Sequence, residues 1–212
     1  YNDAKGLELI QRYSRMFGFD QKSGVEITET DPHLTDQNPI PSAIGQGSHS
    51  YTNVQLNRYA TALATRGNLY DLDIVDKVTS SDGTVIEDYT PQVLSHVDVQ
   101  SSTWDVVLEG MENVISQGGY SSLFSNLPLQ VAGKTGTAEE NQLRANHANF
   151  ISYAPYDDPQ IAVTVNIPNG YEAANAVHVA SRVYQYYYGQ TTLEDILAAG
   201  ATEGGNVNAV DQ

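Results

Sequence analysis

Residues 131–138 combine one cation and two hydroxyl groups within a run of small side chains. Lys134 supplies a positive charge, and Thr135 and Thr137 supply hydroxyl groups that can donate hydrogen bonds to a carboxylate. Gly133 and Gly136 allow another backbone to approach closely, because glycine has no Cβ atom. On an exposed strand edge, these residue types predict a site for a carboxylate or a similar anion.

The same residues also match the end of a phosphate-binding loop, G-x-x-x-x-G-K-[ST], because Gly133 precedes Lys134 and Thr135. That motif needs another glycine five residues before Gly133, and Pro128 occupies this position. The sequence therefore excludes a P-loop. A strand or turn that contains Lys-Thr-Gly-Thr by chance stays open on these four letters alone, since short motifs have a substantial false-positive rate.

The composition narrows the classes of function. With 212 residues the chain can form one sizeable domain. Ten basic and 26 acidic residues give a net charge of −16, which argues against nucleic acid or an anionic membrane surface as a direct partner. There is no cysteine, so a thiol nucleophile or a zinc-thiolate site is excluded. The five histidines show no metal-ligand spacing, and we expect neither a metal nor another cofactor.

The beginning of the chain carries no targeting signal. Tyr1 is neither an initiator methionine nor the start of a signal peptide. No stretch approaches the roughly 18 consecutive apolar residues that a membrane-spanning helix needs. We therefore expect this chain to be the middle or the end of a longer polypeptide.

Helical periodicity dominates the first half of the chain. Residues 4–17 have one apolar face, with Asp3 as the predicted N-cap. Thr52 and Gln55 form a capping box, which predicts the start of a second helix. A third helix is predicted from a cap at Ser102, with an inward face made of Trp104, Val107, Leu108, Met111 and Ile115.

The second half predicts an antiparallel sheet. After a hairpin within residues 74–89, strands are expected near 130–137, 147–153 and 160–167. A helix from Ala173 would cover the sheet with Val177, Ala180, Tyr184 and Tyr187. The sequence therefore predicts an α+β fold, an antiparallel sheet covered by helices. We expect one domain over residues 1–190 and a largely disordered tail over 191–212.

A series of short segments then carries a family resemblance. Downstream these are Lys134-Thr135-Gly136-Thr137-Ala138, His147-Ala148-Asn149-Phe150, Tyr153-Ala154-Pro155 and Asp158-Pro159. Upstream they are Phe17-Gly18-Phe19, Lys22-Ser23-Gly24, Ala43-Ile44-Gly45-Gln46-Gly47 and Ala64-Thr65-Arg66-Gly67. Taken together in their order along the chain, these segments resemble the carboxyl half of a penicillin-binding protein transpeptidase domain. The upstream set is similar to the class B, elongation-type members. The resemblance covers roughly residues 5–188.

The family implies acyl transfer by a serine nucleophile, built from the motifs S-x-x-K, S-x-N and K-T-G. Only the third motif is present: no serine lies three residues before a lysine, and none lies two residues before an asparagine. Both missing motifs lie upstream in the family. We therefore expect a carboxyl-terminal fragment, with an incomplete penicillin-binding protein/serine β-lactamase fold, that is inactive without the amino-terminal part of the same polypeptide.

The resemblance also implies roles for the residues of the third motif. Lys134 and Thr137 would be the catalytic residues of this chain, and Thr135, Gly136 and Thr137 would bind substrate. Lys134 would attract the terminal carboxylate of a peptidoglycan stem peptide or the carboxylate of a β-lactam, and the hydroxyls of Thr135 and Thr137 would hold it. The N–H of Thr137 would be one of two oxyanion-hole donors. Gly136 would leave room for the substrate backbone.

Two other functions remain open from the sequence. A serine β-lactamase or β-lactam sensor domain shares Lys-Thr-Gly, and a non-catalytic scaffold module would explain the missing motifs. The leading hypothesis is a D,D-transpeptidase that acts outside the cytoplasm, anchored to the cell membrane by an upstream segment. In the family, the strand near 160–167 pairs with an amino-terminal strand that this chain lacks, so we expect self-association through its exposed edge.

Overall fold

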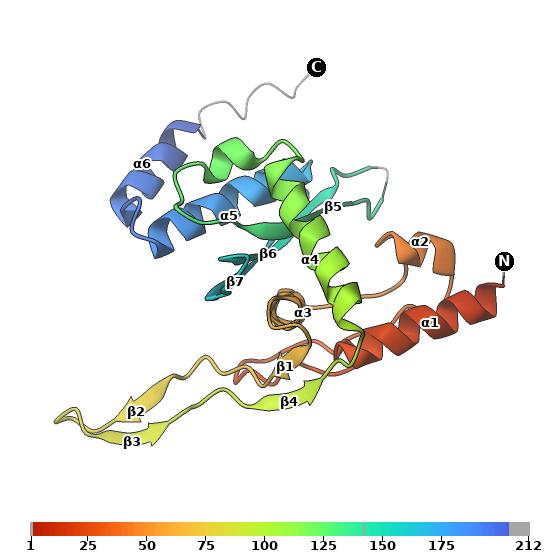
Figure 1. The fold of residues 1–212 in the computed structure, drawn as a ribbon, viewed down its shortest axis with the longest axis horizontal. Coiled ribbons are helices and arrows are strands. Elements are labelled where there is room, and N and C mark those ends of the chain that lie inside the picture. Colours follow the sequence, from red (N-terminus) through yellow and green to blue (C-terminus); the bar gives the residue numbers. More distant parts are fainter. Residues whose placement is uncertain (1, 142, 204–212) are drawn as a thin grey trace.

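The centre of the molecule is a three-stranded antiparallel sheet, which the computed structural model shows together with the rest of residues 2–141 and 143–203. Its strands are β5 (Ala132–Ala138), β6 (His147–Ala154) and β7 (Ile161–Ile167), in the order β5-β6-β7 (Figure 1). These strands match the three predicted ones, and the α+β fold class is confirmed. Because β6 lies in the middle, β5 and β7 are the two outer strands.

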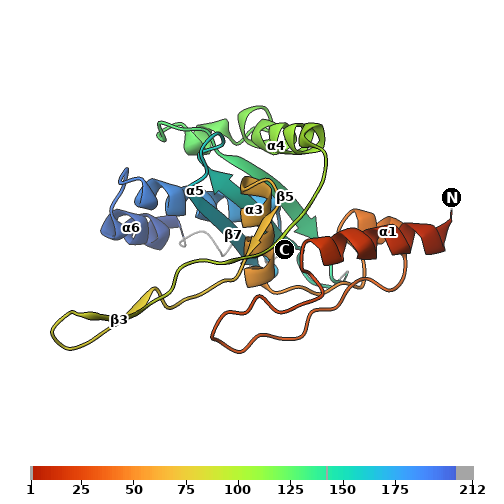
Figure 2. The ribbon, with the colours of Figure 1, turned by 60° about the horizontal axis from the view of Figure 1, so that its bottom comes forward.

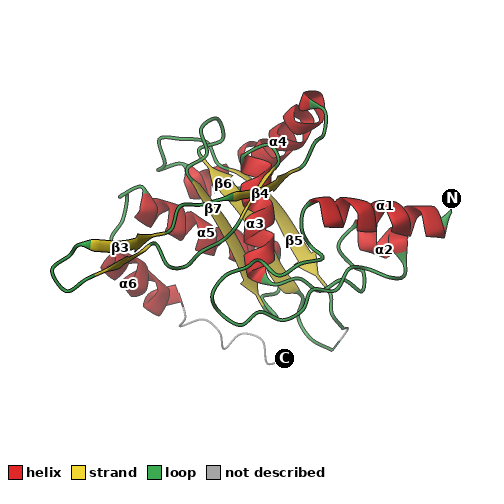
Figure 3. Ribbon diagram, turned by 90° about the horizontal axis from the view of Figure 1, so that it is seen from below, coloured by secondary structure: helices red, strands yellow, loops and turns green. Residues whose placement is uncertain are grey.

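The two faces of the sheet are covered by different helices. Helix α5 (Ala173–Tyr187) packs on one face, where alternate β7 residues join buried Val177, Ala180 and Tyr184. Helices α3 (Asn53–Ala64) and α4 (Ser101–Ser116) cover the other face. Figure 3 shows α3 lying along the strands. The predicted alternation of residues 161–167 is confirmed, since the four β-branched side chains Ile161, Val163, Val165 and Ile167 all contact the α5 core.

The amino-terminal part consists of two helices and a long ordered connection. Helix α1 (Asp3–Met16) is followed by an irregular segment that contains the short helix α2 (Pro39–Ala43). The predicted N-cap of α1 was wrong by one residue: Asn2 is the cap, and its Oδ1 accepts the Lys5 N–H at 3.0 Å. Asp3 instead lies in the first turn, where its negative charge interacts favourably with the positive end of the helix dipole.

A β-ribbon extends away from the sheet. The predicted hairpin is present as β2 (Lys77–Thr79) and β3 (Val85–Asp88). The ribbon continues toward the body of the molecule as β1 (Asn68–Tyr70) paired with β4 (Val93–His96), which the sequence did not predict. Figures 1 and 2 both show the β2–β3 end projecting away from the helices and the sheet.

Helix α4 begins and packs differently from the prediction. It begins at Ser101 after the N-cap Gln100, so Ser102 already lies inside the first turn and does not cap it. Trp104, Leu108, Met111 and Ile115 are buried as predicted, whereas Val107 is 41% exposed. In α5, Tyr187 was likewise predicted to face the sheet, but it is 52% exposed. Periodicity predicts the direction of a side chain, but it does not predict where the covering surface ends.

The two remaining elements are a short 3-10 helix before β5 and a helix after α5. The 3-10 helix η1 (Ser121–Phe124) connects α4 to β5, and its Phe124 joins the α5 core. Helix α6 (Leu193–Glu203) follows α5, so the disorder expected for residues 191–212 is wrong for this segment. The rest of that tail, 204–212, lies outside the described residues. None of the helices in the described part of the chain is long and apolar enough to cross a membrane.

Candidate functional site

Strand β5 carries all of the predicted site residues. Its residues alternate between the two faces of the sheet: Thr135 and Thr137 lie opposite Phe150 and Ala148, which belong to the α5 core. Lys134 lies on the other face, opposite Ile151. Gly133, Lys134 and Thr135 therefore belong to a strand rather than to a strand-to-helix turn, in agreement with the exclusion of a P-loop.

The two glycines of β5 have different reasons to be there. A Cβ atom on Gly133 would lie 2.4 Å from Cζ of Phe150, so the packing of the sheet against α5 requires glycine at this position. A Cβ atom on Gly136 would meet only Cβ of Asn149, at 3.4 Å, which is ordinary contact. The fold therefore tolerates a side chain at 136, and the absence of one leaves space beside the strand.

Lys134 is exposed, and its amino group lies over the strand edge. Nζ donates a hydrogen bond to the carbonyl oxygen of Thr135 at 2.6 Å. Among the residues whose side chains the structure describes, no carboxylate lies within ion-pair distance of Nζ. An incoming anion would therefore meet a cation whose only present partner is a neutral carbonyl group.

Thr137 joins β5 to the beginning of α5. Its Oγ1 accepts the N–H of Ala173, the first residue of α5, at 3.2 Å. The N-cap residue Glu172 makes no side-chain cap of its own, so Thr137 satisfies one of the free amides at this helix end. Because the Thr137 oxygen acts as the acceptor here, its hydroxyl proton stays available for a ligand.

Thr135 differs from Thr137 in its contacts. Its side chain is half-buried, and its hydroxyl makes no hydrogen bond to another residue in the described part of the chain. A hydroxyl group in this state can donate to a ligand without giving up an internal bond. The two threonines thus lie on the same face of the strand, but only the hydroxyl of Thr137 takes part in a hydrogen bond within the described part of the chain.

A groove of about 680 Å³ lies beside the end of β5. Its lining comes from the end of β5, from β6 and β7, and from the segment before α3 and α3 itself: residues 138–140, His147, Asn149, Asn166, Pro168, residues 45–47, residues 49–51 and Leu56. Burial lowers the pKa of His49 in this groove, with a smaller contribution from His33, and its ring stacks on Tyr51 at 5.3 Å. Burial also raises the pKa of Tyr51. The exposed side chains of Glu139 and Glu140 also line this groove.

His147 contacts two neighbouring segments at the start of β6. Its Nε2 lies 3.3 Å from Oε2 of Glu140, and its Nδ1 accepts the N–H of Asn169 at 3.2 Å. In this arrangement the neutral ring carries its proton on Nε2 and donates it to Glu140. Both ring nitrogens of His147 are occupied by neighbouring protein groups, which supports a structural role for this histidine.

Gln46 makes a contact with the end of β5 that was not predicted from the sequence. Its side chain reaches the backbone of Glu139, directly after β5. The only local signal is a long amide side chain between two glycines, and that pattern does not indicate which backbone the amide will contact. The strand and its surroundings thus offer a cation, two hydroxyl groups and an open edge, while the chain contains neither of the two serine motifs.

Comparison with known proteins shows which family this chain matches. The profile described as "Penicillin binding protein transpeptidase domain" matches residues 3–187. The peptidoglycan D,D-transpeptidase MrdA of Haemophilus influenzae is 28% identical over 220 aligned positions, which cover 87% of this chain and 33% of that protein. The chain spans about a third of the length of the curated relatives it matches.

Solved structures agree with the sequence relatives. Penicillin-binding protein 2B of Streptococcus pneumoniae superposes with a TM-score of 0.72 at 26% identity, over 88% of this chain and 33% of that one. The D,D-transpeptidase domain of a peptidoglycan glycosyltransferase from Eggerthella lenta has a TM-score of 0.73 at 22% identity, over 85% and 47% of the two chains, which shows a shared fold. This chain belongs to the penicillin-binding protein transpeptidase domain family.

Proposed function

We propose that this chain is the carboxyl-terminal part of a peptidoglycan D,D-transpeptidase, most similar in its motifs to the class B, elongation-type members, and that β5 is its substrate-carboxylate strand. The observation that carries the proposal is the arrangement along β5. Lys134, Thr135 and Thr137 follow one another on an outer strand, and Gly136 leaves a gap that the fold itself does not require.

The carboxylate of the substrate is the first group to be bound. The cation of Lys134 sets a positive potential, and the hydroxyls of Thr135 and Thr137 donate hydrogen bonds to the carboxylate oxygens. Helix α5 begins at Ala173, whose N–H donates to Thr137 Oγ1, and the positive end of the helix dipole adds to this potential. The natural ligands would be the terminal carboxylate of a peptidoglycan stem peptide and the carboxylate of a β-lactam antibiotic.

The reaction would be acyl transfer through a serine of the missing amino-terminal part. The serine oxygen forms a bond to the carbonyl carbon of the stem peptide while the peptide bond to the terminal residue breaks, and the serine proton passes to the amine that leaves. The amine of a second stem peptide then displaces the serine oxygen to form the cross-link, and its proton returns to the serine. The N–H of Thr137 is one donor to the negative oxygen of the tetrahedral intermediate, and the N–H of the serine is the other. Loss of one such donor typically lowers the rate about 100- to 1,000-fold, so this chain alone is expected to be inactive.

The location and partners follow from the same proposal. The enzyme would act outside the cytoplasm and would be anchored to the membrane by an upstream segment. Its partners would be peptidoglycan and the amino-terminal part of the same polypeptide, and neither nucleic acid nor a cofactor has a role. The excess of acidic over basic residues, 26 against 10, supports the exclusion of nucleic acid.

The test is to incubate the full-length parent protein with benzylpenicillin and to measure its intact mass, followed by peptide mapping. A stable acyl group on a serine upstream of Tyr1 is the expected result. Rapid hydrolysis of the penicillin without a stable adduct would indicate a β-lactamase instead. A folded parent protein that neither binds nor hydrolyses penicillin would indicate a scaffold with a degenerate site.

A further inference from the structure

We propose that Gln46 is a positioning residue for the substrate-carboxylate strand; this inference rests on the proposed function of β5. The amide of Gln46 pairs with the backbone of Glu139, the residue that follows β5. With the amide oriented to match the Glu139 backbone, Nε2 donates to the Glu139 carbonyl oxygen at 3.2 Å, and Oε1 accepts the Glu139 N–H at 3.2 Å. One residue of a neighbouring antiparallel strand would make the same two hydrogen bonds.

This pairing defines where the free edge of β5 ends. Backbone groups along a strand point to alternate sides, so Thr135 and Thr137 direct their N–H and carbonyl groups to the same side as Glu139. The contact of Lys134 Nζ with the Thr135 carbonyl agrees with this direction. Gln46 therefore occupies the last position of the edge and leaves Thr135 and Thr137 for a ligand. It also fixes the backbone two residues beyond the Thr137 N–H.

Gln46 is itself held in place by its backbone neighbours. The N–H of Gln46 donates to the Pro41 carbonyl at 2.8 Å, and the N–H of Gly45 donates to the Ser42 carbonyl at 3.1 Å. Gly47 lies so close to Ser42 that a Cβ atom would fall 2.2 Å from its Oγ. The loop is thus packed tightly against α2, and the Gln46 side chain starts from a fixed point.

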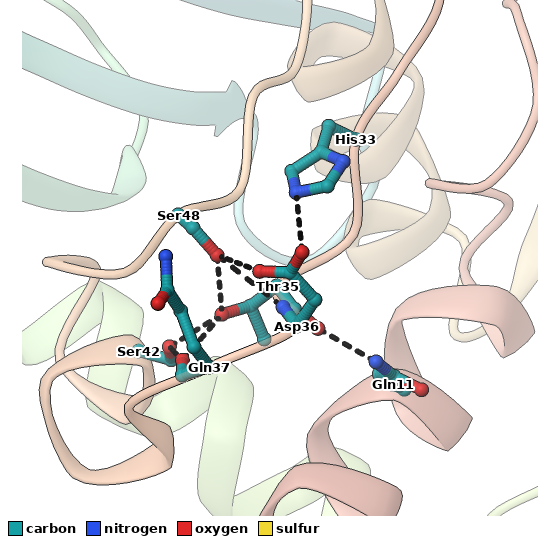
Figure 4. Close-up of polar contacts among 7 residues, drawn as sticks. All are labelled: Gln11, His33, Thr35, Asp36, Gln37, Ser42 and Ser48. Carbon is teal, nitrogen blue, oxygen red and sulfur yellow. Dashed lines mark hydrogen bonds and ion pairs between the residues drawn. The ribbon is translucent and has the colours of Figure 1, made fainter.

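A network of hydroxyl groups attaches this loop to α1 (Figure 4). Oγ1 of buried Thr35 lies 2.6 Å from Oγ of buried Ser42, and Oγ of Ser48 donates to Oδ1 of Asp36 at 2.7 Å. The Thr35 carbonyl accepts Nε2 of Gln11 in α1 at 2.7 Å. The end of β5 is therefore connected through Gln46 to the amino-terminal helices, the part of the chain that continues toward the missing serine motifs in the family.

The experiment compares Gln46→Ala with Gln37→Ala in the full-length parent protein. Gln37 lies in the same connection and is exposed, and only its backbone carbonyl joins the network, so it is the matched control. Hydrogen exchange of a peptide that covers residues 134–141 should be faster in Gln46→Ala and unchanged in Gln37→Ala. The rate constant of acylation by benzylpenicillin should fall about tenfold in Gln46→Ala, with less change in the dissociation constant, because a misplaced donor affects the reacting geometry most.

Gln46→Glu distinguishes this role from simple destabilisation. A protonated glutamic acid can both donate to the Glu139 carbonyl and accept its N–H, whereas a carboxylate can only accept. The acylation rate of Gln46→Glu relative to wild type should therefore approach one near pH 5 and fall several-fold by pH 8. An unchanged exchange rate at 134–141 in Gln46→Ala, or a ratio independent of pH in Gln46→Glu, would overturn the proposal. The exchange measurement needs no activity, so it separates this failure from failure of the transpeptidase proposal.

Discussion

The two outer strands of the same sheet have opposite characters. Strand β5 is built from glycine, threonine and alanine with a single lysine, and its outer side faces space beside the groove. Strand β7 alternates β-branched residues, and its outer side faces α3, where Nδ2 of Asn53 donates to the Thr164 carbonyl at 3.2 Å. Strand β5 offers polar groups without bulk, whereas β7 lies beside α3 and carries apolar side chains on the face that contacts the α5 core.

Under the proposed function of β5, edge position alone does not distinguish the binding strand from the other outer strand. Both strands leave backbone groups unpaired by a neighbouring strand in the described sheet. On β5, small residues and a cation make those groups accessible to a short anionic ligand. On β7, the neighbouring surface is an apolar groove of about 360 Å³ that includes Val54, Ile161 and Val183, which suits a longer apolar segment.

The largest effect is expected from removing the cation of β5. Lys134→Ala in the full-length parent should lower the rate of acylation by benzylpenicillin about 100- to 1,000-fold, a loss comparable to that of an oxyanion donor. Stability should change by less than about 0.5 kcal/mol, because Lys134 is exposed and contacts only its own strand. Lys77→Ala, on the projecting ribbon, is the control and should leave acylation unchanged. Equal losses of acylation rate in both variants would show that Lys134 acts only through the net charge of the protein and not through its position on β5.

Substitutions at the two glycines of β5 should affect different properties, stability at Gly133 and acylation at Gly136. Gly133→Ala is expected to lower the free energy of unfolding by about 1–3 kcal/mol, since its methyl group would overlap the Phe150 ring. Gly136→Ala should leave stability unchanged or raise it by up to about 1 kcal/mol, because alanine restricts the unfolded chain. The same substitution should reduce acylation about tenfold by narrowing the space beside the edge. Thermal unfolding and acylation rates of both variants check this, and an unstable Gly136→Ala would contradict it.

The two threonines should differ in stability but not in ligand binding. Thr137→Ala removes the hydrogen bond to the first N–H of α5 and should lower the free energy of unfolding by about 1 kcal/mol. Thr135→Ala removes no internal hydrogen bond and should cost less. Both variants should weaken binding of a carboxylate ligand. Thr137→Ser should restore stability and binding together; a serine variant as unstable as the alanine variant would show that the methyl group, not the hydroxyl, matters.

The sequence predicted those features that depend on neighbouring residues. The capping box of α3 is present with both hydrogen bonds, from Gln55 N–H to Thr52 Oγ1 at 3.2 Å and from Thr52 N–H to Gln55 Oε1 at 2.9 Å. The central strands were also predicted, and for residues 161–167 the basis was alternation, which is local. The pairing of Gln46 with Glu139 joins segments that are far apart in the chain, and no local pattern encodes such a contact. Helix α6 was missed because its small residues suggested a disordered tail.

The smallest effect is expected at the outer edge of β7 in the isolated chain. The Thr164 carbonyl contacts Asn53, and by alternation the N–H of Asn166 points to the same outer side, away from β6. A second copy that pairs with this edge would use the Asn166 N–H, so Asn166→Pro should reduce self-association without breaking the β6–β7 ladder. Asn166→Ala keeps the N–H and is the control. Sedimentation should show a larger monomer fraction only for proline. A monomeric wild-type chain with protected amides over residues 160–167 would instead show that α3 already covers the edge, and the two edges would then differ in access as well as in composition.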